Sequence, residues 1–169
     1  MDLERVRGKS LLTLPRVHVG QMIGLLEVLE DFKGRVDAAK VADDLILELD
    51  DLLPAVDAAE LLGFLKVESG DLILTEEGRQ FLAKGASGRK KFLNEHIMKL
   101  SAFKAIVDFL RSHKNHEVTR EELLEFLRKE MSDEDAESAI PWIVEWGRYS
   151  LILHYDSNNG KLKILRTPK

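Results

Sequence analysis

DDLLPAVDAAELLGFLKVESGDLILT, residues 50–75, contains the change of pattern that decides the fold. Apolar residues recur at helical spacing over residues 50–62, and Gly63 is a typical helix stop. Residues 64–68 and 72–75 are then short runs of β-forming residues on either side of a Ser-Gly-Asp turn. The stretch therefore predicts a helix followed directly by a β-hairpin.

The residues before and after this stretch extend the pattern. Apolar side chains recur at helical spacing over residues 19–29, and Gly34 ends that segment. Asp37 is a suitable N-cap for a second helix. In the third helix we expect Pro54 to lie in the first turn, where its missing N–H costs nothing. The order helix, helix, helix, hairpin predicts a winged-helix domain, closed by a last helix over residues 76–83.

The same order of elements returns in the second half. Thr119, with Glu122 three residues later, forms the pattern of a capping box. Ser132 is expected to cap a third helix that runs through about Trp146 and ends at Gly147. An Asn-Gly pair between two β-forming runs then marks a second hairpin, over residues 151–155 and 161–165.

The two halves can be aligned. Val36-Asp37 corresponds to Val118-Thr119 at an offset of 82 residues, and Phe64 corresponds to Leu151 at an offset of 87. We therefore predict a mostly α-helical fold with small β-hairpins (α+β), in which two winged-helix domains in tandem are joined by a helical linker that bends near Leu100. The expected parts are an N-terminal extension at residues 1–13, a first domain at 14–85, a short linker at 85–88, and the linker helix with the second domain at 89–167.

Bulk composition excludes several classes of protein. The chain has no cysteine, so thiolate metal sites and disulfides are excluded. It shows neither a signal peptide nor a run long and apolar enough to span a membrane, so we expect a soluble cytoplasmic protein without membrane insertion. The net charge of −5 is unevenly spread: residues 1–85 carry −7 and residues 86–169 carry +2.

Candidate chemical sites are weak. Gly8-Lys9-Ser10 resembles the end of a phosphate-binding loop, but Leu3 stands where that loop needs a glycine. His113 and His116, with Glu117 beside them, have a spacing that could suit a metal, although a solvated turn explains them better. We therefore expect no enzyme activity, no cofactor and no metal site.

Two groups of residues suggest an interaction surface. Carboxylates cluster on the third helix of the first half, where capping of the helix dipole is the simpler explanation. Aromatic residues line one face of the third helix of the second half, where core packing is the simpler explanation. The candidate residues are Asp50, Asp51, Asp57 and Glu60 in the first group, and Trp142, Trp146, Arg148 and Tyr149 in the second.

DNA binding is not favoured by the third helices. In many winged-helix proteins this helix enters the major groove and reads bases with basic or amide side chains. Residues 50–64 carry four acidic residues and no basic one, and residues 132–149 carry five acidic residues before the single basic residue Arg148. Such helices repel a polyanion. A winged-helix transcriptional regulator that uses its wings or the basic linker helix stays as the alternative function.

Four segments together resemble one family. They are residues 14–21, residues 50–64, residues 70–78 and Trp146-Gly147-Arg148-Tyr149. The family is the AAA-associated C-terminal domain, found behind the ATPase domain of nitrate-, sulfonate- and bicarbonate-type ABC transporters, and the resemblance spans about residues 14–165.

The resemblance implies a regulatory accessory module that contacts a protein partner, such as a transporter ATPase or permease. Only about 13 residues precede the similar region, and they contain no complete phosphate-binding loop. We therefore expect a stand-alone version of the domain that does not hydrolyse ATP. Homodimerisation is a further possibility that the sequence leaves open.

Overall fold

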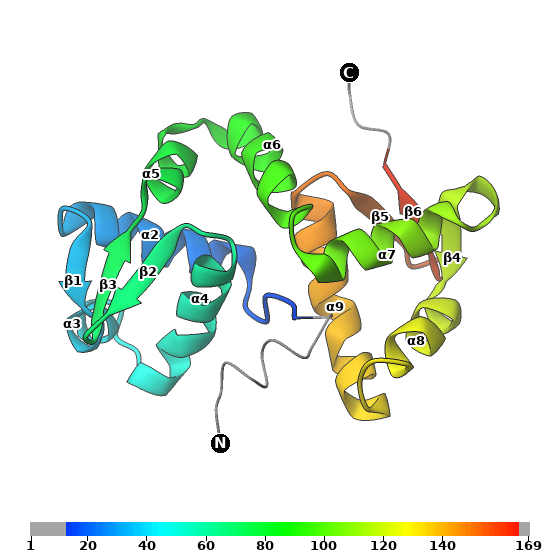
Figure 1. Cartoon of the computed structure of the whole chain (residues 1–169), viewed down its shortest axis with the longest axis horizontal. Coiled ribbons are helices and arrows are strands. Elements are labelled where there is room, and N and C mark those ends of the chain that lie inside the picture. The colour runs from blue at the N-terminus through cyan, green and yellow to red at the C-terminus, as the bar shows by residue number, and fades with distance from the viewer. Residues whose placement is uncertain (1–12, 166–169) are drawn as a thin grey trace. The chain divides into compact units, whose positions relative to one another are not determined.

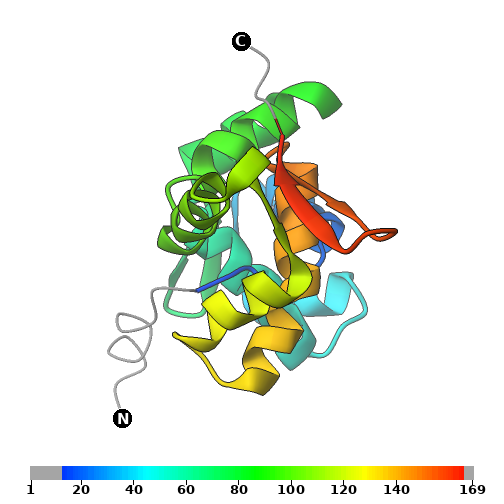
Figure 2. The same cartoon turned by 90° about the vertical axis from the view of Figure 1, so that its right-hand side faces the viewer.

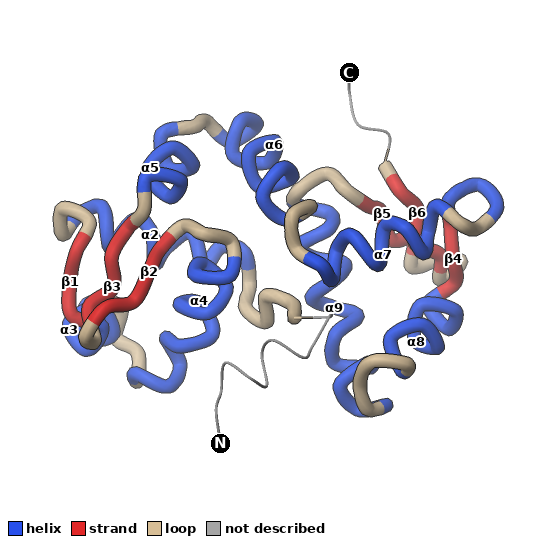
Figure 3. The backbone as a smooth tube through the Cα atoms, in the orientation of Figure 1, coloured by secondary structure: helices blue, strands red, loops and turns tan. Residues whose placement is uncertain are grey.

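The computed structural model describes residues 13–165 and is mostly helical, with two small antiparallel sheets (Figure 3). The contacts between residues divide the described chain into two compact units. Pro15–His96 is called the first unit here, and the described residues from Ile97 onward lie in the second unit. The fold class is α+β, as predicted. None of the described helices is both long enough and apolar enough to cross a lipid bilayer.

The first unit contains five helices and one three-stranded sheet among its described residues (Figure 1). Its sheet has the strand order β1-β3-β2, and both pairings are antiparallel. In chain order the elements are α2 (Val19–Asp31), β1 (Arg35–Asp37), α3 (Ala38–Asp44), α4 (Leu49–Leu61), β2 (Leu65–Glu68), β3 (Asp71–Leu74), α5 (Glu76–Ala83) and α6 (Ala86–Ile97).

Apart from an added 3-10 helix, the second unit has the same order of helices and strands from its first helix to its hairpin. Its sheet order, β4-β6-β5, corresponds to β1-β3-β2 of the first unit. In Figure 2 the orange α9 lies beside β5, with which it makes many contacts. The elements are α7 (Ser101–Arg111), the 3-10 helix η1 (Lys114–His116), β4 (Glu117–Thr119), α8 (Arg120–Arg128), α9 (Asp133–Tyr149), β5 (Leu153–Asp156) and β6 (Lys161–Ile164).

Buried apolar side chains hold the units together. In the first unit α2 packs against α4 and against β3, and its inward side chains are almost fully buried. Strand β3 alternates half-buried and buried residues, as a sheet with one covered face does. The largest buried side chains include Met22, Phe64 and Phe81 in the first unit, and Phe103 and Trp146 in the second.

Local sequence signals set where the helices begin. The Asp37 carboxylate accepts a hydrogen bond from the backbone N–H of Ala39 (2.9 Å), as expected for the N-cap of α3. Thr119 and Glu122 form the predicted capping box: the Thr119 hydroxyl accepts from the Glu122 N–H at 3.1 Å, and the Glu122 carboxylate accepts from the Thr119 N–H at 2.9 Å. Ser132 caps α9. The predicted helix starts are thus confirmed at these positions.

Both predicted hairpins are confirmed as the pairs β2–β3 and β5–β6. In the first, Ser69 and Gly70 both have positive φ (51° and 84°), which is the geometry of a two-residue turn that suits the twist of the strands. Strands β1 and β4 were not predicted from the sequence. Each is only three residues long, and each gains its partner from a strand about 40 residues away in the chain.

Three expectations need correction. Helix α4 begins at Leu49, so Pro54 lies inside the helix, beyond its first turn. Gly147 does not end α9, which continues to Tyr149; a Cβ atom at this position would lie 2.6 Å from Cγ of Leu153, so glycine is needed for the packing of β5. The expected linker at residues 85–88 instead contains the start of α6, most of which lies in the first unit.

Candidate interaction surface

Large apolar side chains are exposed where α3 leads into α4. Ile46 is 92% exposed, and Leu47, Leu49 and Leu53 are each exposed by about 40% or more. Scattered exposed apolar residues are normal, whereas a contiguous group marks an interaction site. Among residues 13–165, six large hydrophobic side chains are exposed, and four of them fall within eight residues of sequence. These four residues are called the α3–α4 surface.

Ile46 lies in the hydrogen-bonded motif that ends α3. Leu45 caps the end of α3, the N–H of Ile46 donates to the carbonyl of Asp43 (3.1 Å), and the N–H of Leu47 donates to the carbonyl of Ala42 (2.8 Å). This is a Schellman motif, in which the residue after the cap takes positive φ and is usually glycine. Ile46 takes it with φ 57°. A β-branched residue in this conformation costs about 1–2 kcal/mol, so the position is strained as well as exposed.

The equivalent motif at the end of α4 shows the usual solution. Gly63 has φ 81° and its N–H donates to the carbonyl of Glu60, while the N–H of Phe64 donates to the carbonyl of Ala59. The same hydrogen bonds therefore form with glycine, without strain. Isoleucine at position 46 is not required for the helix to end.

A cavity of about 150 Å³ lies beside the α3–α4 surface, within the first unit. Leu47 lines this cavity and is also one of the exposed residues. Most of the wall is apolar, and Gln21 and Asp51 add polar groups. At Gly24, a Cβ atom would meet nothing within 4 Å, so the cavity reaches the backbone of α2. The lining residues are Val17, Gln21, Gly24, Leu25, Leu45, Leu47, Asp51, Leu52 and Ala55.

Negative charge surrounds this apolar surface. Residues 41–65 contain seven acidic residues and no lysine, arginine or histidine. Five of the seven carboxylates are exposed close in sequence to the four apolar residues, and none of these five forms an ion pair with another described residue. They are Asp43, Asp44, Glu48, Asp50 and Asp51. The carboxylates therefore give the surface a negative field.

The predicted acidic residues take two positions on α4. Asp50 and Asp51 lie in its first turn, next to Leu49, and Asp51 also lines the cavity. Asp57 is exposed and Glu60 is half-buried, both farther along the helix. Asp50 and Asp51 thus belong to the acidic border of the α3–α4 surface, and helix-dipole stabilisation accounts for them equally well.

The predicted aromatic group lies on α9 in the second unit. Trp146 is fully buried, so its ring packs in the interior and presents no surface to a partner. Trp142 and Tyr149 are half-buried, and Arg148 is exposed. The Arg148 guanidinium donates from Nη2 to the carbonyl oxygen of Tyr155 (3.1 Å), which ties α9 to the hairpin. For Trp146, the role is therefore core packing, which was the simpler explanation of the aromatic group, and not contact with a partner.

The four apolar residues of the α3–α4 surface were not among the interaction residues predicted from the sequence. The available signal was the run Leu45-Ile46-Leu47 between two pairs of aspartates, in a segment too short to be a strand of the core. A pattern of this kind does not reveal exposure, because leucine and isoleucine are usually buried.

The second unit offers an internal comparison. Its α8 and α9 correspond to α3 and α4, and the residues that connect them are Lys129-Glu130-Met131-Ser132. Lys129 and Glu130 are exposed, and Met131 is half-buried. The same arrangement of elements thus forms with a mostly polar connection, so the fold does not require exposed isoleucine and leucine there.

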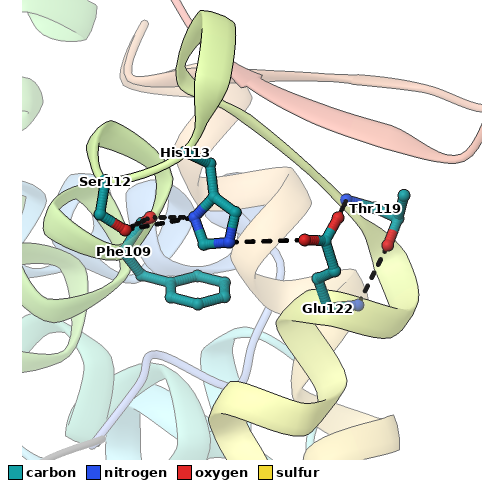
Figure 4. A network of polar contacts seen from close by, with 5 residues as sticks. All are labelled: Phe109, Ser112, His113, Thr119 and Glu122. Carbon is teal, nitrogen blue, oxygen red and sulfur yellow. Dashed lines mark hydrogen bonds and ion pairs between the residues drawn. The ribbon is translucent and has the colours of Figure 1, made fainter.

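His113 serves local structure. Nδ1 of His113 lies 2.8 Å from the carbonyl oxygen of Phe109, and its Nε2 lies 3.4 Å from a carboxylate oxygen of Glu122 (Figure 4). The backbone N–H of Thr119, and then its hydroxyl, hold the pKa of Glu122 below its ordinary value. Residues 13–165 contain no group of three or more potential metal ligands. Residues 8–10, with the Gly-Lys-Ser sequence, lie outside the described residues.

One ion pair in the second unit is also well formed. Nη2 of Arg120 donates to a carboxylate oxygen of Glu137 at 2.7 Å, and this hydrogen bond raises the pKa of Arg120 above its ordinary value. The bond links the start of α8 to α9. It therefore supports the packing of these helices rather than a chemical step.

Comparison with known protein families shows a match. A family model described as a C-terminal AAA-associated domain matches residues 39–156, which is more than half of the chain. The matched region includes the α3–α4 surface and α9, and it starts after the resembling segment at residues 14–21. No curated protein and no solved structure matches the chain.

Proposed function

This chain belongs to the C-terminal AAA-associated domain family, and on that premise we propose that it is a non-enzymatic regulatory module that binds an ATPase partner. The partner is a transporter ATPase, or a permease associated with one, and the contact takes place in the cytoplasm. The α3–α4 surface is the proposed contact site. The observation that carries this proposal is the exposure of Ile46, Leu47, Leu49 and Leu53 together.

Energetics support a function for these side chains. The exposed part of an apolar side chain gains nothing on folding, and it is removed from water only when a partner covers it. Ile46 adds backbone strain that glycine or asparagine would relieve. Strained residues of this kind cluster at functional sites. A protein contact explains both the exposure and the strain.

The fold proposed for each unit is a winged helix, so the chain is a tandem of two. Support comes from the repeated order of helices and strands and from the matching strand orders β1-β3-β2 and β4-β6-β5. In this assignment α4 and α9 are the third helices. The five exposed carboxylates around α4 favour a protein partner for the first unit and disfavour duplex DNA.

Two half-buried or buried histidines have structural contacts that account for them. His96 and His113 each bridge a backbone carbonyl and a carboxylate. In both residues these contacts involve the two ring nitrogens and help to position the helices. We therefore propose that the chain acts by binding, without catalysis.

Affinity capture of the tagged full-length chain from its native host tests the proposed function. The bound proteins are quantified by mass spectrometry for the wild type and for the double variant Ile46→Asn with Leu53→Gln. We expect an ATPase or permease subunit to be enriched with the wild type and lost with the double variant. The control is Val67→Thr, since Val67 is 43% exposed on β2 of the same unit. If no such subunit is enriched with the wild type, the proposed function is wrong.

A further inference from the structure

We infer that the α3–α4 surface binds a basic segment of a partner protein, which inserts one large apolar side chain into the cavity beside Gly24. The inference rests on the proposed function and names the chemistry that this site recognises. Two independent features carry it: the size and lining of the cavity, and the sign of the surrounding charge.

The cavity suits one apolar anchor. Apolar cavities of about 150 Å³ accept a group of about the size of a benzene ring, and this cavity has that volume. Leu25, Leu45 and Leu52 supply apolar walls. A leucine, methionine or phenylalanine side chain therefore matches it in size and polarity. The exposed side chains of Ile46 and Leu49 lie close in sequence to Leu47 at the cavity and extend the apolar contact.

The negative charge beside the cavity favours basic residues next to the inserted apolar side chain. Asp51 lines the cavity and Asp50 precedes it in the first turn of α4, so a cation beside the anchor finds carboxylates in reach. Lysine and arginine side chains near the anchor would pair with these groups. Electrostatic complementarity of this kind speeds association and rejects wrong partners.

The same charge argues against other occupants. Residues 1–85 carry a net charge of −7, so a second copy of the chain that docked through the same surface would bring like charges together. Duplex DNA and acidic lipid surfaces meet the same repulsion. A basic protein segment is the occupant that the surface favours.

Titration calorimetry on the full-length chain tests this inference, with a synthetic amphipathic peptide of leucine and lysine as the probe. The central variant is Gly24→Leu, which fills the cavity with a side chain of the protein itself. The matched control is Gly20→Leu, one turn earlier on α2, where a Cβ atom also meets nothing within 4 Å and which does not line the cavity. Circular dichroism checks that both variants keep the wild-type helix content.

We expect the wild type and Gly20→Leu to bind the peptide alike, and Gly24→Leu to bind it about tenfold more weakly or worse. The double variant Asp50→Lys with Asp51→Lys should lose affinity as well, and a peptide with glutamate in place of lysine should not bind. Equal affinity of Gly24→Leu and Gly20→Leu would overturn the inference. So would a wild-type dimer that Gly24→Leu converts to a monomer, because the occupant would then be a second copy.

The two proposals fail in different ways. If the capture experiment recovers no ATPase or permease subunit but peptide binding depends on Gly24, the proposed function is wrong and the binding chemistry of the surface stands. If such a subunit is captured equally by the wild type and by Gly24→Leu, the function stands and the cavity has no part in it.

Discussion

Nε2 of His96, on α6, lies 2.8 Å from a carboxylate oxygen of Glu77, on α5. The ring is almost fully buried, and its Nδ1 lies 2.8 Å from the carbonyl oxygen of Phe92. It stacks on the Phe92 ring and lies 5.1 Å, centroid to centroid, from the Phe64 ring. Arg89 adds a second link, because its Nη2 donates to the carbonyl oxygen of Leu82 (3.0 Å). These contacts hold α6 to the first unit.

Replacing His96 by alanine should therefore loosen α6. The change removes the polar contacts of the ring with the Phe92 carbonyl and the Glu77 carboxylate and leaves a space beside Phe64, so we expect a loss of about 2 kcal/mol in the free energy of unfolding. Hydrogen exchange should rise in α6 more than in α7. Glu95→Ala, an exposed neighbour on the same helix, is the control. Unchanged exchange in α6 would show that the His96 contacts do not hold the helix.

Gly78 should not tolerate a side chain. A Cβ atom there would lie 2.3 Å from the backbone carbonyl oxygen of Phe64, and backbone cannot rotate away. We expect Gly78→Ala to destabilise the protein by about 3 kcal/mol, measured by urea unfolding. Gly85→Ala, where a Cβ atom meets nothing within 4 Å, should change stability little. Similar stability of the two variants would contradict the tight packing of α5 on Phe64.

The capping box at α8 predicts a pH dependence. Hydrogen bonds from Thr119 lower the pKa of Glu122 in the folded chain. A lowered folded pKa means that the carboxylate stabilises the fold above its unfolded pKa, and that this contribution is lost as the pH falls through the folded pKa. Urea unfolding at neutral and at acidic pH should therefore show a smaller acid-induced loss of stability for Glu122→Gln than for the wild type. Glu125→Gln, on the same helix, should behave like the wild type.

Ile46 should show opposite effects on stability and on binding. Asparagine adopts positive φ more readily than isoleucine, and a side chain that is 92% exposed contributes little to the core. We expect Ile46→Asn to raise the free energy of unfolding by about 1 kcal/mol and to weaken capture of the partner. Thermal unfolding and the capture experiment measure the two effects. A variant that is less stable than the wild type would show that Ile46 serves the fold.

Local signals made much of the fold predictable. Asp37, Thr119 and Ser132 cap helices where the sequence places them, and both hairpins form at the predicted turns, because these effects act between residues close in the chain. Strands β1 and β4 were not predictable in this way. Their stability comes from pairing with β3 and β6, which lie far away in the sequence.

The roles of the glycines were also only partly predictable from the sequence. Gly63 ends α4 with positive φ, as its sequence position suggests, whereas Gly147 lies inside α9 because Leu153 needs the space. Sequence alone does not separate a glycine that stops a helix from one that admits a neighbour. For the proposed site, the sequence offered the carboxylates Asp50 and Asp51 as candidates, which stays a prediction. It did not identify Ile46, because the exposure of an apolar residue depends on the whole fold.

Site-specific photo-crosslinking tests the central claim most directly. A photoreactive amino acid is placed at position 46 of the full-length chain, and in a second version at position 67, and both are irradiated in the native host. Crosslinked proteins are identified by mass spectrometry. The proposed function predicts a crosslink from position 46 to an ATPase or permease subunit, and none to that subunit from position 67. A crosslink to it from position 67 alone, or no crosslink to such a subunit from position 46, would contradict the proposal.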